Sequence, residues 1–151
     1  MKFKVCGLFN EENINKVAKL NPDYVGHIFW EKSVRYLNII SPNLKKEIKK
    51  TGVFFNSKID NVFNRIQEHN LACVQLHGEE SPQYCRNIMD SGTKVIKSFR
   101  IDDDFDFSIL KNYENNCDLF LFDSKSELPG GTGKSFNWEN LKKYKLKKEF
   151  F

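Results

Sequence analysis

Short apolar runs with a β-prone composition recur along the chain, and segments with helical spacing lie between them. The runs are Phe3–Cys6, Tyr24–Phe29, Gly52–Phe55, Ala72–Leu76, Lys94–Phe99 and Leu119–Phe122. Their length and their β-branched and aromatic residues predict buried strands. Because these strands alternate with helical segments, the pattern predicts right-handed βαβ crossovers and a parallel sheet.

The helical segments are marked by apolar spacing or by capping residues. Apolar residues at i, i+3, i+4 and i+7 predict a helix over 59–66 with Ser57 as its N-cap, and another helix follows Asn10, behind two acids suited to a first turn. Ser41–Pro42 and Ser81–Pro82 each predict an N-cap followed by a first-turn proline. Weaker helical patterns occupy 106–113 and 137–144.

Two architectures fit this alternation: an open doubly wound sheet, and part of a (βα)8 TIM barrel. The strands start about 23 residues apart, which favours the short, even units of a barrel. Polar residues also stand at or just past several strand ends: Cys6, Asn56, His77, Arg100 and Asp123. In a barrel these ends converge on one mouth, whereas in an open sheet they spread along an edge. We therefore predict a partial barrel.

The length sharpens this prediction. Eight units at this spacing need roughly 186 residues, and the chain has 151. We expect a single domain over 1–151 that is an incomplete (βα)8 barrel with six βα units, and Glu149–Phe151 as the start of strand seven. Open edges make such a C-terminally truncated monomer prone to aggregation, and we expect it to be poorly active.

Composition and charge exclude several classes. The chain is 40% hydrophobic with 8 glycines and 4 prolines, which excludes disorder. No run of about 18 apolar residues predicts a membrane span, and the start lacks a signal-peptide core, so we expect a cytoplasmic protein. The net charge of +4 resides entirely in residues 141–151, with five lysines and one glutamate. Such a run predicts a solvated helix end, and we expect no nucleic-acid partner.

Cysteine and histidine spacing argues against a metal site. The four cysteines form no Cys-x-x-Cys pair and the three histidines are scattered, so we expect reduced thiols and no metal.

Two strand ends carry groups suited to acid–base chemistry. Cys6 closes the first strand, where a thiolate can act as a base or nucleophile; the alternative is a buried structural cysteine. Asp123 closes the most hydrophobic strand, where burial predicts a raised pKa and a general acid; the alternative is a solvated loop residue or helix cap.

Two further residues could contact a substrate. His77 can hydrogen-bond a substrate, or it can satisfy backbone groups of its own loop. Arg35 can clamp a carboxylate or lie at the surface beside Tyr36.

A glycine-rich stretch, Leu128–Ser135, ends in Gly-Lys-Ser. A P-loop needs glycine where Leu128 stands and should follow its strand directly, so a nucleotide or phosphate site of that kind is a weak alternative. A mobile loop over the barrel mouth fits the stretch better.

Together these residues resemble the phosphoribosylanthranilate isomerase family. The matching segments, in family order, are Lys4-Val5-Cys6-Gly7-Leu8, Tyr24-Val25-Gly26, Lys32-Ser33-x-Arg35-Tyr36, Gly52-Val53-Phe54-x-Asn56, Val74-Gln75-Leu76-His77-Gly78-Glu79-Glu80, Phe122-Asp123-Ser124-Lys125 and Gly130-Gly131-Thr132-Gly133-Lys134. The chain departs from the family pattern at Phe9, His27 and Val34. The first two departures are expected to change packing near the mouth and the third to loosen a loop.

The resemblance implies an Amadori rearrangement of N-(5′-phosphoribosyl)anthranilate in tryptophan biosynthesis, with no metal or cofactor. It implies that Asp123 is the general acid, that Cys6 is the general base, that Arg35 holds the anthranilate carboxylate, and that His77 with Gln75 lines the mouth. The family's phosphate site follows strands seven and eight, which this chain lacks. The rival hypothesis is a non-catalytic binding or scaffold remnant, or a fragment that pairs with a second chain; the sequence does not predict the oligomeric state.

Overall fold

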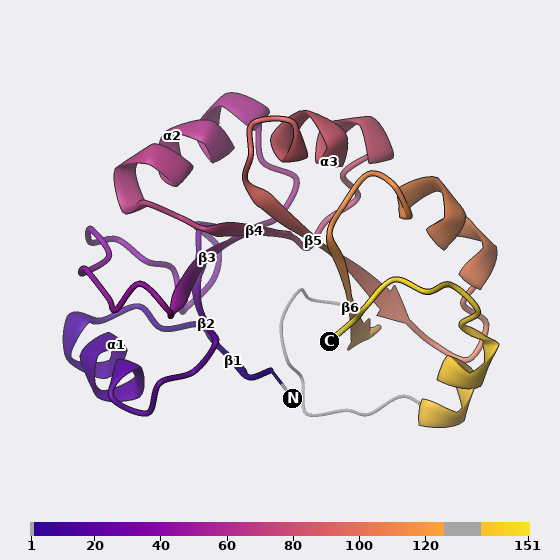
Figure 1. The fold of residues 1–151 in the computed structure, drawn as a ribbon, viewed down its shortest axis with the longest axis horizontal. Helices are drawn as coiled ribbons and strands as arrows, with labels where there is room; N and C mark the ends of the chain where they lie inside the picture. Colours follow the sequence, from indigo (N-terminus) through magenta and orange to yellow (C-terminus); the bar gives the residue numbers. More distant parts are fainter. Residues whose placement is uncertain (1, 126–136) are drawn as a thin grey trace.

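The computed structural model describes residues 2–125 and 137–151, and it consists of one curved sheet with helices on its outer face (Figure 1). The strands are β1 (Lys4–Cys6), β2 (Tyr24–Ile28), β3 (Lys49–Phe54), β4 (Cys73–Leu76), β5 (Lys94–Ile101) and β6 (Leu119–Ser124). The helices are α1 (Glu11–Ala18), α2 (Ile59–His69), α3 (Pro82–Met89) and the 3-10 helices η1 (Phe107–Tyr113) and η2 (Trp138–Lys143).

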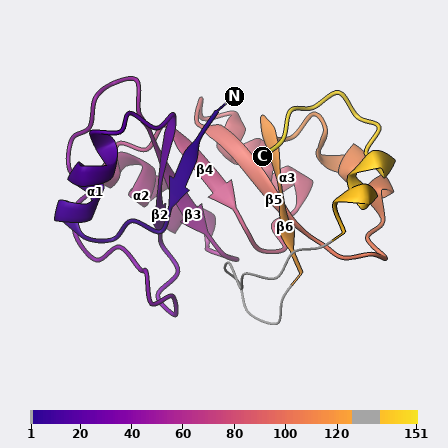
Figure 2. The same ribbon diagram turned by 90° about the horizontal axis from the view of Figure 1, so that it is seen from below.

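The six strands pair in sequence order, and every pair is parallel. A doubly wound sheet reverses its strand order at a switch point, and this sheet has no such reversal. The helices lie on the convex side and both termini on the concave side (Figures 1 and 2). The prediction of a partial (βα)8 barrel is therefore confirmed.

The last residues add the beginning of a further strand beside β6. Phe150 forms a parallel bridge with Phe120. The Phe151 N–H donates to the Phe120 carbonyl at 3.0 Å, and the Phe120 N–H donates to the Glu149 carbonyl at 3.1 Å. The predicted start of strand seven is present at these residues.

The main core lies between the sheet and its helices. Each helix except η2 contributes a buried apolar side chain to it: Ile14, Val62, Ile88 and Leu110. A smaller cluster on the concave face contains Tyr24, Cys73 and Ile96, with Phe151 packed against them. Successive side chains of each strand thus point alternately to the helix-covered face and to the concave inner face of the sheet.

Two of the predicted helix starts are correct and one is displaced. Asn10 and Ser81 cap α1 and α3 through side-chain oxygens that accept from the third following N–H, at 2.8 and 3.2 Å. The N-cap of α2 is Lys58 rather than Ser57, and no side chain caps it. The carbonyl of Ser57 instead accepts a hydrogen bond of 2.8 Å from the hydroxyl of Tyr84 on α3.

The helix predicted from Ser41–Pro42 does not form. Ser41 is buried, and its hydroxyl donates to His27 Nε2 at 2.9 Å while its N–H donates to His69 Nδ1 at 3.2 Å. These tertiary bonds occupy the groups that a helix cap would use. His27 Nδ1 in turn donates to the carbonyl of Leu8 at 2.9 Å, so His27 links the segment after β1 to Ser41.

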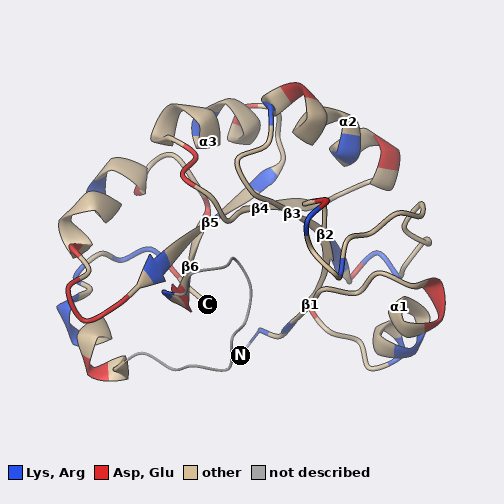
Figure 3. Ribbon diagram, turned by 180° about the vertical axis from the view of Figure 1, so that it is seen from behind, with Lys and Arg blue, Asp and Glu red and all other residues tan. Residues whose placement is uncertain are grey.

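Charged residues of both signs alternate over the helices and loops (Figure 3). The lysine run near the end of the chain is only partly solvated, because Lys148 Nζ donates to the Cys117 carbonyl at 2.7 Å and lies over the Phe120 ring. Among the described residues, no helix is long and apolar enough to cross a membrane.

Candidate active site

Five side chains singled out in the sequence line one cavity of about 330 Å³ at the carboxyl ends of the strands: Cys6, Arg35, Gln75, His77 and Asp123. They come from β1, the loop after β2, the end of β4 and β6. The parallel order of the sheet brings these ends together, as the barrel prediction requires. The other two polar strand ends lie elsewhere: Asn56 supports a loop, and Arg100 lines a neighbouring cavity.

Cys6 is the exposed thiol of the chain, and the other three cysteines are buried. Burial raises the pKa of Cys85 and of Cys117 to about 12, and it also raises that of Cys73. A thiol must ionise to act as a base, so the three buried cysteines are chemically inert at neutral pH. The reactive position is therefore Cys6.

A close backbone approach seats Arg35 against the first strand end. Gly7 has φ +80°, and a Cβ there would lie 2.8 Å from Arg35 Nη1 and 2.9 Å from its Cδ. Only glycine satisfies both the left-handed conformation and this contact. Within the described part of the chain, the Arg35 guanidinium has no carboxylate partner, so its N–H groups are available to hydrogen-bond an anionic ligand.

A chain of polar side chains crosses the floor of the cavity from β5 to β6. Gln75 Nε2 donates to Ser98 Oγ and to His77 Nδ1, at 3.0 Å each. With Nδ1 accepting, the proton of a neutral His77 resides on Nε2, which lies 3.5 Å from Asp123 Oδ2. This separation is longer than a normal hydrogen bond, so the Nε2–H of His77 lies beside the Asp123 carboxyl without a close hydrogen bond, and the contact is an ion pair only when His77 is protonated.

The pKa of Asp123 is lowered, contrary to the sequence prediction. The interaction with His77 is the main cause and outweighs burial, which acts in the opposite direction; the Ser124 N–H, 2.9 Å from Oδ1, adds to the lowering. The prediction considered the apolar strand alone and missed the partner on β4. Acid catalysis by Asp123 at neutral pH therefore requires that its carboxyl take up a proton in each turnover.

Two buried polar atoms in this chain have no hydrogen-bond partner among the described residues: Gln75 Oε1 and His77 Nε2. Unsatisfied buried groups cost free energy, and native structures usually reserve them for a ligand or a catalytic role. One acceptor and one donor at the same cavity suit a ligand that offers a hydroxyl or amine beside a carbonyl or ring oxygen.

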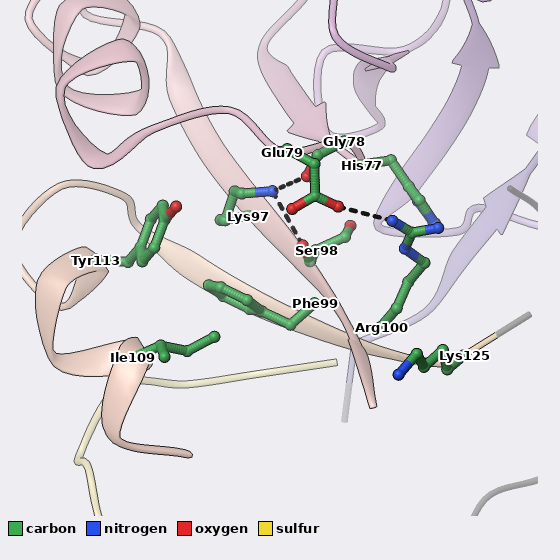
Figure 4. Close-up of a pocket in the computed structure, with 10 residues that line it drawn as sticks. All are labelled: His77, Gly78, Glu79, Lys97, Ser98, Phe99, Arg100, Ile109, Tyr113 and Lys125. Carbon is green, nitrogen blue, oxygen red and sulfur yellow. Dashed lines mark hydrogen bonds and ion pairs between the residues drawn. The ribbon is translucent and has the colours of Figure 1, made fainter. Parts of the chain in front are cut away.

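A buried ion pair between Lys97 and Glu80 supports the end of β4 from the outer side, and its lysine is drawn in Figure 4. Lys97 Nζ lies 3.2 Å from Glu80 Oε2, with both side chains almost fully buried, and it also donates to the Gly78 carbonyl at 2.6 Å. Glu80 accepts in turn from the N–H groups of Gly78 and Asn56. The sequence analysis missed this pair, although a lysine inside an apolar strand signals a buried charge that needs a partner.

The neighbouring cavity, of about 280 Å³, lies between the β4 loop and η1 (Figure 4). Its two rim cations are already paired, Arg100 with Glu79 and Lys125 with Asp102. His77 lines both cavities. Because its charges are compensated, this cavity has less to offer an anion than the one that holds Arg35.

The described residues contain no group of three or more His, Cys, Asp or Glu side chains placed to hold a metal. The glycine-rich stretch Leu128–Ser135, with its P-loop and mobile-loop predictions, lies outside the residues that the structure describes.

A parallel (βα) barrel with a thiol, a carboxyl–histidine pair and a free guanidinium at the carboxyl ends of its strands defines a barrel enzyme equipped for acid–base chemistry. The family model for N-(5′-phosphoribosyl)anthranilate (PRA) isomerase matches residues 3–151. The chain belongs to this family of isomerases.

Individual relatives agree with this assignment. The N-(5′-phosphoribosyl)anthranilate isomerase of Phocaeicola vulgatus is 39% identical over 150 residues, which cover 99% of this chain and 73% of the relative. The crystal structure of phosphoribosylanthranilate isomerase from Thermotoga maritima superimposes with a TM-score of 0.80 at 30% identity, covering 95% of this chain and 71% of that one. A third structure, of the isomerase in complex with reduced 1-(o-carboxyphenylamino)-1-deoxyribulose 5-phosphate, gives a TM-score of 0.61 at 26% identity over 81% of this chain and 74% of that one.

The buried ion pair predicts a large stability cost when one partner is removed. Lys97→Met should lower the free energy of unfolding by about 3–5 kcal/mol, because Glu80 then remains buried without a counter-charge. Urea unfolding measures the effect. Lys94→Met, at an exposed position of the same strand, should change the value by less than about 0.5 kcal/mol. A Lys97→Met variant as stable as the Lys94→Met control would contradict the assigned role.

The contact with His77 predicts a measurable shift at Asp123. In a ¹³C carboxyl titration the Asp123 pKa should lie below the ordinary aspartate value, and His77→Asn should raise it, because the main lowering interaction is lost and burial remains. Asp106, whose pKa is lowered by its own contacts with Ser108, should titrate unchanged in the variant and serves as the internal control. An unchanged Asp123 pKa would show that the two side chains are not coupled.

Proposed function

We propose that this chain carries the acid–base groups for the Amadori rearrangement of N-(5′-phosphoribosyl)anthranilate to 1-(2-carboxyphenylamino)-1-deoxyribulose 5-phosphate, a step of tryptophan biosynthesis. The observation that carries the proposal is the single cavity that holds Cys6, Asp123 and Arg35 in a chain of this isomerase family. The reaction moves protons and breaks one C–O bond, which these groups can perform.

Asp123 is the proposed general acid. It protonates the ribose ring oxygen while the C1′–O bond breaks, and the nitrogen lone pair forms the iminium of a Schiff base. Its lowered pKa leaves few protons on the carboxyl at neutral pH. Asp123 must therefore take up a proton in each turnover, and His77 Nε2 lies 3.5 Å from its carboxyl.

Cys6 is the proposed general base. Its thiolate removes the C2′ proton, an S–H bond forms, and the C–H electron pair neutralises the iminium to give an enolamine. Tautomerisation of the enolamine places a proton on C1′ and leaves the ketone at C2′. The iminium is the electron sink, so the proposal requires neither metal nor cofactor.

Three further side chains are proposed to bind the substrate. The unpaired Arg35 guanidinium holds the anthranilate carboxylate through two parallel hydrogen bonds. Gln75 Oε1 and His77 Nε2, the buried unpartnered atoms, accept from and donate to the sugar. These contacts suit a ligand that carries a carboxylate and hydroxyl groups, as the phosphorylated substrate named for this isomerase family does.

We further propose that residues 1–151 form one partial-barrel domain, supported by a main core that runs from Leu8 to Phe122 across the whole sheet. A cytoplasmic location is supported by the four free cysteines and by membership of a biosynthetic enzyme family.

Substitution of the acid and the base tests the mechanism. Cys6→Ala and Asp123→Asn should each lower kcat by about 10²–10⁴-fold, the usual contribution of a general acid or base, as followed by chromatographic separation of substrate and product. Asp104→Asn, at an exposed acid, is the matched control and should leave turnover unchanged.

Near-full activity in Cys6→Ala or in Asp123→Asn would remove that residue from its role. A wild-type chain that binds the product analogue without converting substrate would instead favour the rival hypothesis, a non-catalytic binding remnant of the barrel.

A further inference from the structure

Lys4 is a charged side chain at the cavity that the proposed mechanism does not use. It lies on β1 two residues before Cys6, and successive alternate residues of a strand point to the same face. Lys4 and Cys6 both line the cavity that also contains Asp123. The strand therefore presents a cation and a thiol side by side to the same space.

Gly26 on β2 creates the room for this pair. It is the register partner of Cys6, and a Cβ at Gly26 would lie 2.7 Å from Cys6 Sγ and 3.0 Å from Lys4 Nζ. Any larger residue would displace one or both atoms. The sulfur and the ammonium thus occupy the volume that a side chain on the neighbouring strand would otherwise fill.

The Lys4 ammonium has no counter-charge of its own. No described residue forms a hydrogen bond or an ion pair with Lys4 Nζ, and its charge acts on the buried His27 as one of several causes that lower the pKa of that histidine, burial being the largest. By contrast, Lys2, which precedes the strand, pairs with Glu149 at 3.1 Å. An unpaired cation in a partly desolvated cavity stabilises an anion placed beside it.

We propose that Lys4 is a positioning residue that favours the thiolate form of Cys6, the proposed general base. The proposal rests on the proposed role of Cys6 for its catalytic meaning. The charge effect itself is a property of the resting protein and does not require turnover.

Several other titratable or charged groups face Cys6 from the surrounding elements and also contribute to the electrostatic potential at its sulfur. They are Arg35 after β2, His77 at the end of β4 and Asp123 on β6. Substitution of Lys4 leaves these groups unchanged, so the pH dependence of Cys6 reactivity distinguishes the Lys4 charge from a change in access to the sulfur.

The alkylation rate of Cys6 by iodoacetamide provides a direct measurement. The remaining cysteines are buried, so the native protein should take a single label at Cys6, which mass spectrometry verifies. At pH 7, Lys4→Met should lower the rate constant about tenfold, because an opposite charge favours the ionised form of a nearby group. At a pH where the thiol is ionised in both proteins, the two rates should converge.

Three controls define the result. Lys4→Arg should keep the rate within about twofold of wild type, because it keeps the charge. Lys2→Met, at the nearby lysine that pairs with Glu149, should leave the rate unchanged. Lys4→Gln supplies a second neutral side chain should the methionine disturb folding, and in urea all variants should react at the same rate.

An unchanged rate at pH 7 in both neutral variants would overturn the proposal. An alkylation rate constant that falls by the same factor at every pH would overturn it too. Such a result would mean that Lys4 controls access of the reagent to the sulfur and not the ionisation of the thiol. Failure of Cys6 as the general base would be separate: Cys6→Ala would then retain turnover, whatever the alkylation rates of the Lys4 variants.

Discussion

All strands of the sheet are parallel and pair in the order in which they occur along the chain, and this constraint places every functional side chain. It forces each strand to end at the same rim, so residues more than a hundred positions apart, such as Cys6 and Asp123, line one cavity. The helices on the convex face supply the core that holds the sheet in this curvature (Figure 1). Without that order, the same side chains would lie along an edge and share no ligand.

Charged and polar side chains lie on both faces of the sheet at the carboxyl ends of its strands. Behind β4, the Lys97–Glu80 pair is buried and fully bonded, which fixes the loop that begins at His77. In front, His77 and Gln75 present polar atoms, and Arg35 presents a guanidinium, for which residues 2–125 and 137–151 supply no partner. The satisfied network thus provides the rigid support, while the unsatisfied groups face the ligand, the division expected of a preorganised site.

Sequence reasoning recovered the features that depend on local pattern. Strand periodicity and caps gave the six strands, the starts of α1 and α3 and the shared position of Cys6, Arg35 and Asp123. It failed where long-range contacts decide. Ser41 bonds to two histidines from other elements instead of capping a helix, and His77 reverses the pKa shift expected at Asp123. Neither partner could be assigned before the sheet order was known.

The central claim is that these side chains form one ligand site in this chain. The most direct test is a ¹⁵N–¹H NMR titration with reduced 1-(o-carboxyphenylamino)-1-deoxyribulose 5-phosphate, the ligand named for the structure of a relative. The account predicts saturable shifts centred on the amides of Cys6, Gly7, Arg35, His77 and Asp123. The amide of Gly92, in the turn between α3 and β5, should not shift. Saturable shifts confined to other surfaces, or none at millimolar ligand, would contradict it.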